Sequence, residues 1–249
     1  MREVALVLGG GGARGIAHIH VLQAFDDLGI KPCVIAGSSI GSVMGAGYAA
    51  GMSGAEIAEY AVRTFSKRAE VMARLWRLRP DGFAAAIMGG LPRVGELNAQ
   101  KVMRAFLPDA IPERFEDLQI PLKVTATDFF SSTLTVLESG DLFQAIAASS
   151  AIPVVFRPEI IDGRVHVDGG FVNPVPFDLV MAPGRIVVAV DVIGMPRGKD
   201  RNMPTRIEAA FGASQLLMHS ITRLMLDKHK PDLLIRPEIS DFRVLDFLY

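Results

Sequence analysis

Cysteine is almost absent from this chain, since Cys33 is the only one among 249 residues. One thiol excludes an internal disulfide and a cysteine-based metal cluster. No stretch of about 18 consecutive apolar residues is present, so a transmembrane helix is not expected. The N-terminus leads directly into an apolar segment and lacks the layout of a signal peptide. These absences favour a cytoplasmic protein, with peripheral contact at the inner membrane surface as a further option.

The chain also lacks an excess of charge of one sign, with 26 basic and 27 acidic residues and a net charge of −1. Because the chain has no overall excess of positive charge, nucleic acid is not expected as a partner. Half of the residues are hydrophobic, and the mean hydropathy of +0.32 is high for a soluble protein. A sheet that is covered on both faces explains this best. An exposed apolar surface for a lipid or a partner is the alternative.

Short apolar runs alternate with helical periodicity along the chain. Residues 4–8 predict a strand, 9–15 a glycine-rich turn and 16–28 a helix, and the order strand, turn, helix returns at 34–36, 38–42 and 43–50. This repetition indicates an α/β protein with a parallel sheet, formed by one domain over residues 1–249. The later expected elements are helices at 55–73, 142–149 and 207–227 and strands at 122–127, 133–137, 165–167, 186–192 and 233–235.

Residues 72–93 combine large apolar side chains, among them Met72 and Trp76, with several arginines. An ordinary amphipathic packing segment is the favoured interpretation. The alternative is a mobile lid or a membrane-facing flap, because apolar groups flanked by arginines suit an interface.

Two glycine-rich motifs follow the first two strands. The first, Gly-Gly-Gly-Ala-Arg-Gly at positions 10–15, has the spacing G-x-G-x-x-G, and its backbone N–H groups suit either a phosphate or an oxyanion. A dinucleotide site would need an acidic residue about twenty positions later, yet residues 29–39 contain none. The second motif, Gly-Ser-Ser-Ile-Gly at 37–41, is a G-x-S-x-G string between a strand and a helix. This context predicts a nucleophile elbow with Ser39 at its tip.

A serine nucleophile needs a base. His18 and His20 lie in the first turns of a helix, and His166 precedes Asp168 by two residues on a strand. Asp168 opens Asp-Gly-Gly at the C-terminal end of that strand, where active groups of open α/β sheets gather. By itself, Asp-Gly-Gly is more typical of a plain turn.

Taken together, the three motifs in this order resemble the patatin-like phospholipase family, as found in bacteria. The segments 148–153 and 173–176 resemble the flanks of the aspartate motif in that family, and the likeness extends from about residue 4 to 237. The resemblance implies a three-layer α/β/α fold with a mainly parallel central sheet. It also implies hydrolysis of phospholipid, lysophospholipid or simpler acyl esters, without a metal or cofactor.

The resemblance further implies a Ser39–Asp168 dyad in place of a triad. The N–H groups of Gly11 and Gly12 would form the oxyanion hole, Gly10 and Gly15 would shape the loop, and Arg14 would fix it. The elbow would depend on Gly37 and Gly41, and the aspartate motif on Gly169 and Gly170. We therefore expect Ser39 Oγ within direct hydrogen-bond reach of Asp168, about 2.6–3.2 Å.

Three alternatives remain open at this point. An acyltransferase would use the same elbow with an acceptor other than water. A non-catalytic regulatory module would bind lipid or a partner, although it would have no reason to keep Ser39, Asp168 and the glycine loop. A dinucleotide-binding protein is a distant fourth interpretation. His20 stands where many bacterial relatives have glycine, and it would either narrow the acyl site or face outward.

Overall fold

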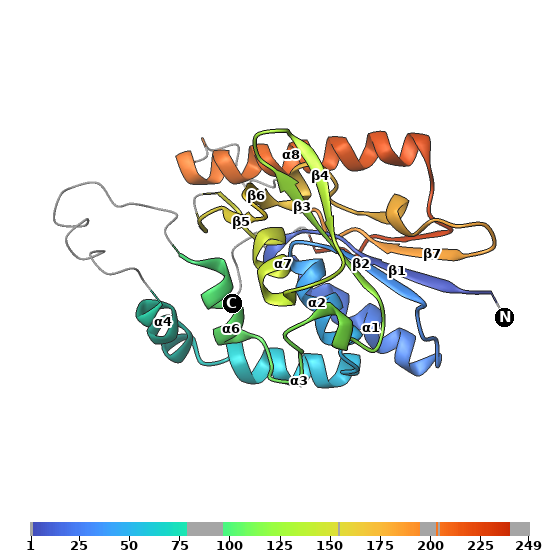
Figure 1. Ribbon diagram of the computed structural model, residues 1–249, viewed down its shortest axis with the longest axis horizontal. Helices are drawn as coiled ribbons and strands as arrows, with labels where there is room; N and C mark the ends of the chain where they lie inside the picture. The colour runs from blue at the N-terminus through green and yellow to red at the C-terminus, as the bar shows by residue number, and fades with distance from the viewer. Residues whose placement is uncertain (1, 79–96, 154, 195–202, 204, 240–249) are drawn as a thin grey trace.

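A mixed sheet forms the centre of the molecule, and helices cover both of its faces (Figure 1). The computed structural model describes residues 2–78, 97–153, 155–194, 203 and 205–239. Within these ranges the strand order is β5-β6-β3-β2-β1-β7-β8, with β4 paired to β3. The strands are β1 (Val4–Leu8), β2 (Val34–Ser38), β3 (Leu122–Asp128), β4 (Thr133–Leu137), β5 (Glu159–Ile161), β6 (Arg164–Asp168), β7 (Ile186–Val190) and β8 (Leu233–Ile235).

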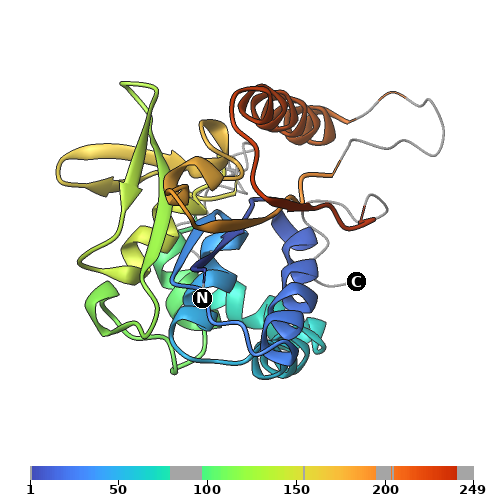
Figure 2. The same ribbon diagram turned by 90° about the vertical axis from the view of Figure 1, so that its right-hand side faces the viewer.

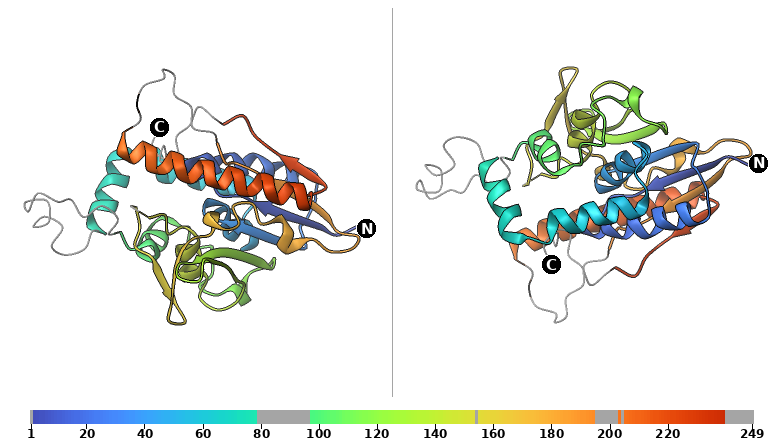
Figure 3. Two further views of the ribbon diagram at one scale, coloured as in Figure 1. Left: turned by 90° about the horizontal axis from the view of Figure 1, so that it is seen from above. Right: turned by 90° about the horizontal axis from the view of Figure 1, so that it is seen from below.

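Most helices lie on one face of the sheet, whereas a single long helix lies on the other (Figures 2 and 3). The first group contains α1 (His18–Asp27), α2 (Ile40–Ala49), α3 (Gly54–Phe65) and α7 (Leu142–Ser149), with α4 (Arg68–Arg77) and α6 (Ala99–Phe106) at its end. The long helix is α8 (Arg206–Lys228). Short 3₁₀ turns are η1 (Gly12–Ala17), η2 (Phe115–Asp117), η3 (Gly169–Phe171) and η4 (Phe177–Val180).

The central strand β1 is apolar on both faces because helices or turns cover both. Leu6 and Leu8 pack in the larger core beneath α1 and α2. Ala5 and Val7 pack in a second core with Phe177 and with residues of α8. All four β1 side chains are completely buried. The high hydrophobicity of the chain is therefore explained in large part by a doubly covered sheet.

Both β2 and β6 pair with the same edge of β3. The antiparallel partner β4 occupies the other edge over residues 124–128. The parallel strand β2 pairs as far as Ser38 opposite Thr125, and the antiparallel strand β6 pairs from Asp168 opposite Ala126. Because Thr125 and Ala126 are consecutive, β2 and β6 meet head to head at their C-terminal ends.

The first turn of α2 packs directly against the end of β1. A Cβ atom added at Gly41 would overlap the carbonyl oxygen of Leu8, so only glycine permits this approach. The approach places the N-terminus of α2, with its partial positive charge, directly after the serine that ends the β2–α2 turn.

Several predicted element boundaries are wrong. The expected helix 16–28 begins as the 3₁₀ turn η1, and its α-helical part spans only His18–Asp27. The expected helix 43–50 begins three residues earlier, at Ile40. The expected helix 55–73 is two helices, α3 and α4, separated at residues 66–67. The strand expected at 186–192 ends at Val190. The sequence interpretation missed β5 and α6.

The suggested lid over 72–93 lies largely outside the described residues, since only 72–78 are described, and 68–77 belong to α4.

The close approach at Gly41 predicts a large loss of stability in Gly41→Ala. The methyl group would push α2 away from β1, which costs about 1–3 kcal/mol or more of unfolding free energy. Gly47→Ala in the same helix is the matched control, because a Cβ there meets Ile57 at an ordinary 3.5 Å. Urea denaturation measures both, and equal stability of the two variants would contradict the prediction.

Candidate active site

Ser39 lies at the turn between β2 and α2 in a strained backbone conformation. Its φ is 52° and its ψ is −125°, a combination that L-residues with a side chain rarely adopt. Such strain costs about 1–3 kcal/mol and persists only where the surroundings enforce it. The carbonyl of Ser39 accepts the hydroxyl of Ser42 at 2.6 Å, and its N–H donates to Ser149 Oγ at 2.8 Å. These contacts hold the turn and present the Ser39 side chain above the sheet.

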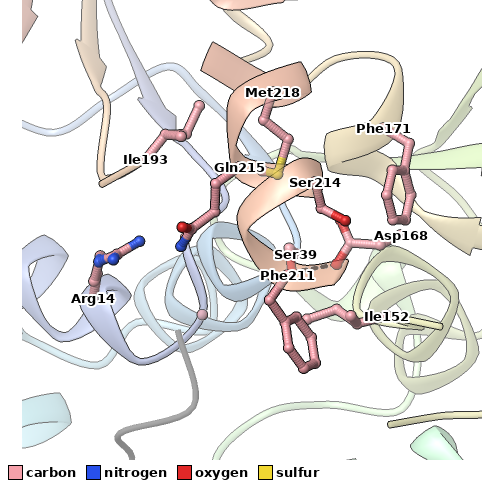
Figure 4. Close-up of a pocket in the computed structure, with 12 residues that line it drawn as sticks. Arg14, Ser39, Ile152, Asp168, Phe171, Ile193, Phe211, Ser214, Gln215 and Met218 are labelled. Carbon is pink, nitrogen blue, oxygen red and sulfur yellow. Dashed lines mark hydrogen bonds between the residues drawn. The ribbon is translucent and has the colours of Figure 1, made fainter. Parts of the chain in front are cut away.

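Asp168 ends β6 and points at Ser39 (Figure 4). The Ser39 hydroxyl donates to Asp168 Oδ2 at 2.6 Å, and the N–H of Gly170 donates to Oδ1 at 2.7 Å. The predicted direct contact between Ser39 and Asp168 is confirmed. Both carboxylate oxygens have a donor, so the orientation of the Asp168 side chain is fixed.

Burial raises the pKa of the Asp168 carboxyl to about 6, although its hydrogen bonds from Ser39 and Gly170 act in the opposite direction. The side chain is only 5% exposed, and desolvation disfavours its charged form. A carboxylate with a pKa near 6 is a much stronger proton acceptor than an exposed one.

The last residue of α7 and the segment that follows it brace both residues of this pair. Ser149 Oγ accepts the Ser39 N–H, and the carbonyl of Ala151 accepts the N–H of Asp168 at 3.2 Å. Ile152, one residue further, lines the pocket at the pair. The sequence interpretation flagged residues 148–153 only by resemblance and did not assign the contact of Ser149.

The glycine loop of residues 10–15 lies beside Ser39. Gly10 donates its N–H to the carbonyl of Pro174 at 2.9 Å, so this group is occupied. Gly11 and Gly12 line the pocket with Ser39, and among the described residues their N–H groups donate to no partner. Gly12 has a φ of +62°, which favours glycine. Arg14 is buried and also lines the pocket.

The remaining predicted glycines allow close packing around the pair. A Cβ atom at Gly15 would overlap Ile40, and one at Gly37 would overlap the backbone of Ser42. A Cβ atom at Gly169 would overlap the carbonyl oxygen of Thr125. At Gly170 the added atom would meet the methyl group of Met218 at 2.6 Å. The geometry thus brings all of the predicted site residues to one region.

None of the described histidines stands between Ser39 and Asp168. His166 hydrogen-bonds with the Thr135 hydroxyl at 3.2 Å and with the Arg164 carbonyl at 3.1 Å. His20 is exposed, so of its two expected orientations the outward one is observed.

His18 is buried at the base of the glycine loop, where its Nε2 lies 2.8 Å from the carbonyl oxygen of Gly9. Burial lowers the pKa of His18 to about 4, so the ring is neutral at pH 7 and its Nε2–H donates to that carbonyl. This bond fixes the start of the loop.

Helix α8 forms a roof over the pair. Phe211, Ser214, Gln215 and Met218 of α8 line a cavity of about 40 Å³ with Ser39 and Asp168. Such a volume holds about one or two water molecules, whereas ligand pockets measure about 300–1,000 Å³. Arg14 and Ile193 lie on one side of Ser39 and Phe171 on the other (Figure 4). The sequence predicted α8 as an amphipathic helix but gave no sign of what it covers.

The outer side of α8 carries several exposed leucines. Leu216, Leu217 and Leu224 are each more than half exposed. No helix that the structure describes has both the length and the apolar character needed to span a bilayer. Within the same residues, no three His, Cys, Asp or Glu side chains form a group suited to a metal ion.

The sequence matches the family described as Patatin-like phospholipase over residues 6–181. The chain belongs to this family. It has the patatin fold, a mixed sheet with helices on both sides. Members of the patatin-like phospholipase family are lipid hydrolases, and this chain is a member by most of its length.

Curated relatives of this patatin-like chain come from bacteria and eukaryotes. An uncharacterized NTE family protein of Mycobacterium tuberculosis is 36% identical over 237 residues, which cover 91% of this chain and 61% of that protein. Lysophospholipase NTE1 of Yarrowia lipolytica is 30% identical, with 99% of this chain and 18% of that protein covered. The chain thus spans about three fifths of the mycobacterial relatives and far less of the fungal one.

Solved structures with a similar arrangement are more distant in sequence. VipD from Legionella pneumophila has a TM-score of 0.49 at 16% identity, covering 91% of this chain and 55% of that one. Human GIVD cytosolic phospholipase A2 has a TM-score of 0.43 at 13% identity, covering 91% and 45%.

Removal of the Ser149 hydroxyl should destabilise this patatin-like site. Ser149→Ala leaves the Ser39 N–H buried without an acceptor, which costs about 1–3 kcal/mol. Ser150→Ala is the matched control, because Ser150 Oγ is buried and has no hydrogen-bond partner among the described residues. Chemical denaturation of the two variants makes the comparison. A loss of stability in Ser150→Ala as large as that in Ser149→Ala would contradict the assigned contact.

The buried carboxylate should cost stability at neutral pH. In the folded chain the pKa of Asp168 is about 6, against an ordinary value of 3.8, so the folded state loses stability as pH rises through this interval. Asp168→Asn should therefore unfold with a free energy higher than wild type by on the order of 3 kcal/mol at pH 8. The difference should vanish below about pH 3, where the carboxyl is protonated in both the folded and the unfolded state. Urea denaturation across pH tests this, with exposed Asp227→Asn as the charge control, and a constant difference would refute it.

Proposed function

We propose that this chain is a serine acyl-ester hydrolase of the phospholipase A, lysophospholipase or esterase type, acting through a Ser39–Asp168 dyad. The observation that carries the proposal is the 2.6 Å hydrogen bond from the Ser39 hydroxyl to the buried Asp168 carboxylate. Family membership supports a lipid ester as the substrate, since patatin-like phospholipases are lipid hydrolases.

The first step is an attack by Ser39 Oγ on the ester carbonyl carbon. The hydroxyl proton passes to Asp168 Oδ2, and the carbonyl becomes a tetrahedral oxyanion. The N–H groups of Gly11 and Gly12 are available to this oxyanion, because no described residue accepts from them. Each such donor is typically worth about 10²–10³ in rate. Collapse of the intermediate expels the alcohol, which takes the proton from Asp168, and leaves an acyl group on Ser39.

The second step releases the acid. Asp168, again a carboxylate, removes a proton from a water molecule, which attacks the acyl carbon. The same oxyanion forms and collapses, and Ser39 Oγ recovers the proton as it leaves. A pKa near 6 suits this double role, because the group is largely ionised at neutral pH yet basic enough to accept a proton.

Access to the dyad requires a change at α8. A cavity of about 40 Å³ cannot hold an ester of lipid size. Phe211 and Met218 must therefore move away from Ser39 before such a substrate can bind. This requirement favours substrates held in a surface that also contacts the exposed leucines on the outer side of α8.

Hydrolysis of p-nitrophenyl esters tests the proposal. Wild type should turn over these esters, while Ser39→Ala and Asp168→Asn should lose at least about a thousandfold in kcat/KM. Because Asp168 must be ionised to act as a base, kcat/KM should fall about tenfold per pH unit below pH 6. Labelling by a fluorophosphonate probe should depend on Ser39 in the same way.

His166→Gln is a suitable control, because His166 bonds to Thr135 and Arg164 and does not contact the dyad. Circular dichroism shows whether each variant stays folded. Loss of turnover in His166→Gln comparable to that in Asp168→Asn would overturn the dyad. A folded wild type that neither labels nor turns over, even with detergent micelles, would overturn the hydrolase.

A further inference from the structure

Helix α8 carries a buried amide into the wall of the cavity at Ser39. Among the described residues that line this cavity, only Gln215 has a side-chain amide. Gln215 is 8% exposed, and its amide has no hydrogen-bond partner in the part of the chain that the structure describes. A polar group removed from water without a partner costs free energy, which a hydrogen bond to a ligand would recover. The amide therefore points to a contact with the substrate.

The direction of this side chain is visible in the close-up of the site (Figure 4). Gln215 extends from α8 toward the side of Ser39 on which Arg14 lies, whereas the preceding residue, Ser214, extends toward the other side. Successive residues of an α-helix point about 100° apart, so these two neighbours face different parts of the cavity. The Ser214 hydroxyl already donates to a backbone carbonyl of α8 at 3.1 Å. The amide of Gln215 is thus the available polar group that α8 brings to the site.

The reacting atoms of an ester determine what this amide would contact. The leaving oxygen takes its proton from Asp168 and therefore lies on that side of the site. The carbonyl oxygen turns toward the glycine loop, where the N–H groups of Gly11 and Gly12 have no described acceptor. Arg14 belongs to the same loop, so Gln215 extends toward the oxygen that becomes negatively charged. A neutral amide donor at this position stabilises the transition state more than the uncharged ester.

We propose that Gln215 is a further catalytic residue, whose side-chain N–H donates to the oxyanion together with the N–H groups of Gly11 and Gly12. The inference rests on the proposed function. The amide transfers no proton and stays neutral throughout, and its hydrogen bond weakens again when the tetrahedral intermediate collapses. Helix α8 is then part of the catalytic machinery as well as a cover. It must return over Ser39 after an ester has entered, because only then does the third donor reach the oxyanion.

The kinetics of Gln215→Met with p-nitrophenyl acetate test the proposal. Methionine is unbranched like glutamine but has no N–H donor. Because the donor acts in the transition state, kcat should fall about a hundredfold while KM changes less than about twofold. Gln215→Glu keeps the shape of the side chain and places a carboxylate near the oxyanion, so its kcat should fall at least as far. If Gln215→Met does not fold, Gln215→Glu carries the same test.

Two further measurements distinguish an oxyanion donor from a structural role. Octyl trifluoromethyl ketone accepts Ser39 Oγ at its carbonyl carbon, the hydroxyl proton passes to Asp168, and a tetrahedral oxyanion results. Its Ki should rise about a hundredfold in Gln215→Met, in parallel with the loss in kcat. The loss in kcat/KM should also be equal for phenyl acetate and p-nitrophenyl acetate, because the two esters form the same oxyanion. A contact with the leaving group would make the loss depend on the alcohol and would overturn the assignment.

Thr222→Val is the matched control on the same helix. Thr222 is buried, its hydroxyl has no partner among the described residues, and it does not line the cavity. This variant should keep the wild-type kcat and Ki, and circular dichroism shows whether each variant is folded. An unchanged kcat in Gln215→Met, or an equal loss in Thr222→Val, overturns the inference and leaves the hydrolase standing. A folded wild type without turnover overturns the hydrolase, and the inference falls with it.

Discussion

The edge of β3 is shared by two strands that run in opposite directions, and the site depends on this sharing. Because β2 and β6 end against the consecutive residues Thr125 and Ala126, the residues at their ends must meet. Ser39 and Asp168 are 129 residues apart in the sequence, yet their side chains form a hydrogen bond of 2.6 Å. The end of α7 and the loop after it then brace both partners, through Ser149 and Ala151 respectively. No further element is needed to bring the hydroxyl to the carboxylate.

This arrangement lowers the free energy of unfolding in two ways. Ser39 adopts a strained backbone conformation, and Asp168 is a carboxyl group with almost no access to water. Each feature costs on the order of a few kcal/mol, comparable with a large part of the net stability of a typical domain. The fully buried residues of β1 and β2 offset these costs, since helices and turns cover the two faces of the sheet. The strained turn and the buried carboxyl thus lie at the ends of strands next to a well-buried core.

The sequence identified the site residues where close local packing requires a particular residue type, as at the glycines of the motifs. Gly41 must be glycine because α2 touches Leu8, and Gly169 because β6 turns against Thr125, so these glycines marked Ser39 and Asp168. The direct contact between the two could be expected once their order matched a known family. The roles of His18 and Ser149 were not visible, because a buried histidine and a serine in a small-residue segment have no distinctive local pattern.

The helices that cover the sheet and the site were the hardest elements to predict from the sequence. Periodicity located α8 within one residue at each end, yet an amphipathic pattern does not say which surface its inner side meets. The contacts of Phe211 and Met218 with the site are long-range and depend on how the chain returns after β7. Apolar periodicity continues across residues 66–67, so the sequence predicts one helix where the structure has α3 and α4.

The roof formed by α8 has a thermodynamic consequence. On the proposed function, an acyl ester of lipid size binds only to those protein molecules in which α8 has moved, so its apparent affinity is the intrinsic affinity multiplied by the fraction of molecules in that state. A surface that binds Leu216, Leu217 and Leu224 more tightly when the helix is displaced raises the fraction. Linkage then requires that a bound substrate strengthen the hold on that surface by the same factor. On this proposal, substrate binding at Ser39 and binding of a surface to the outer side of α8 are coupled equilibria.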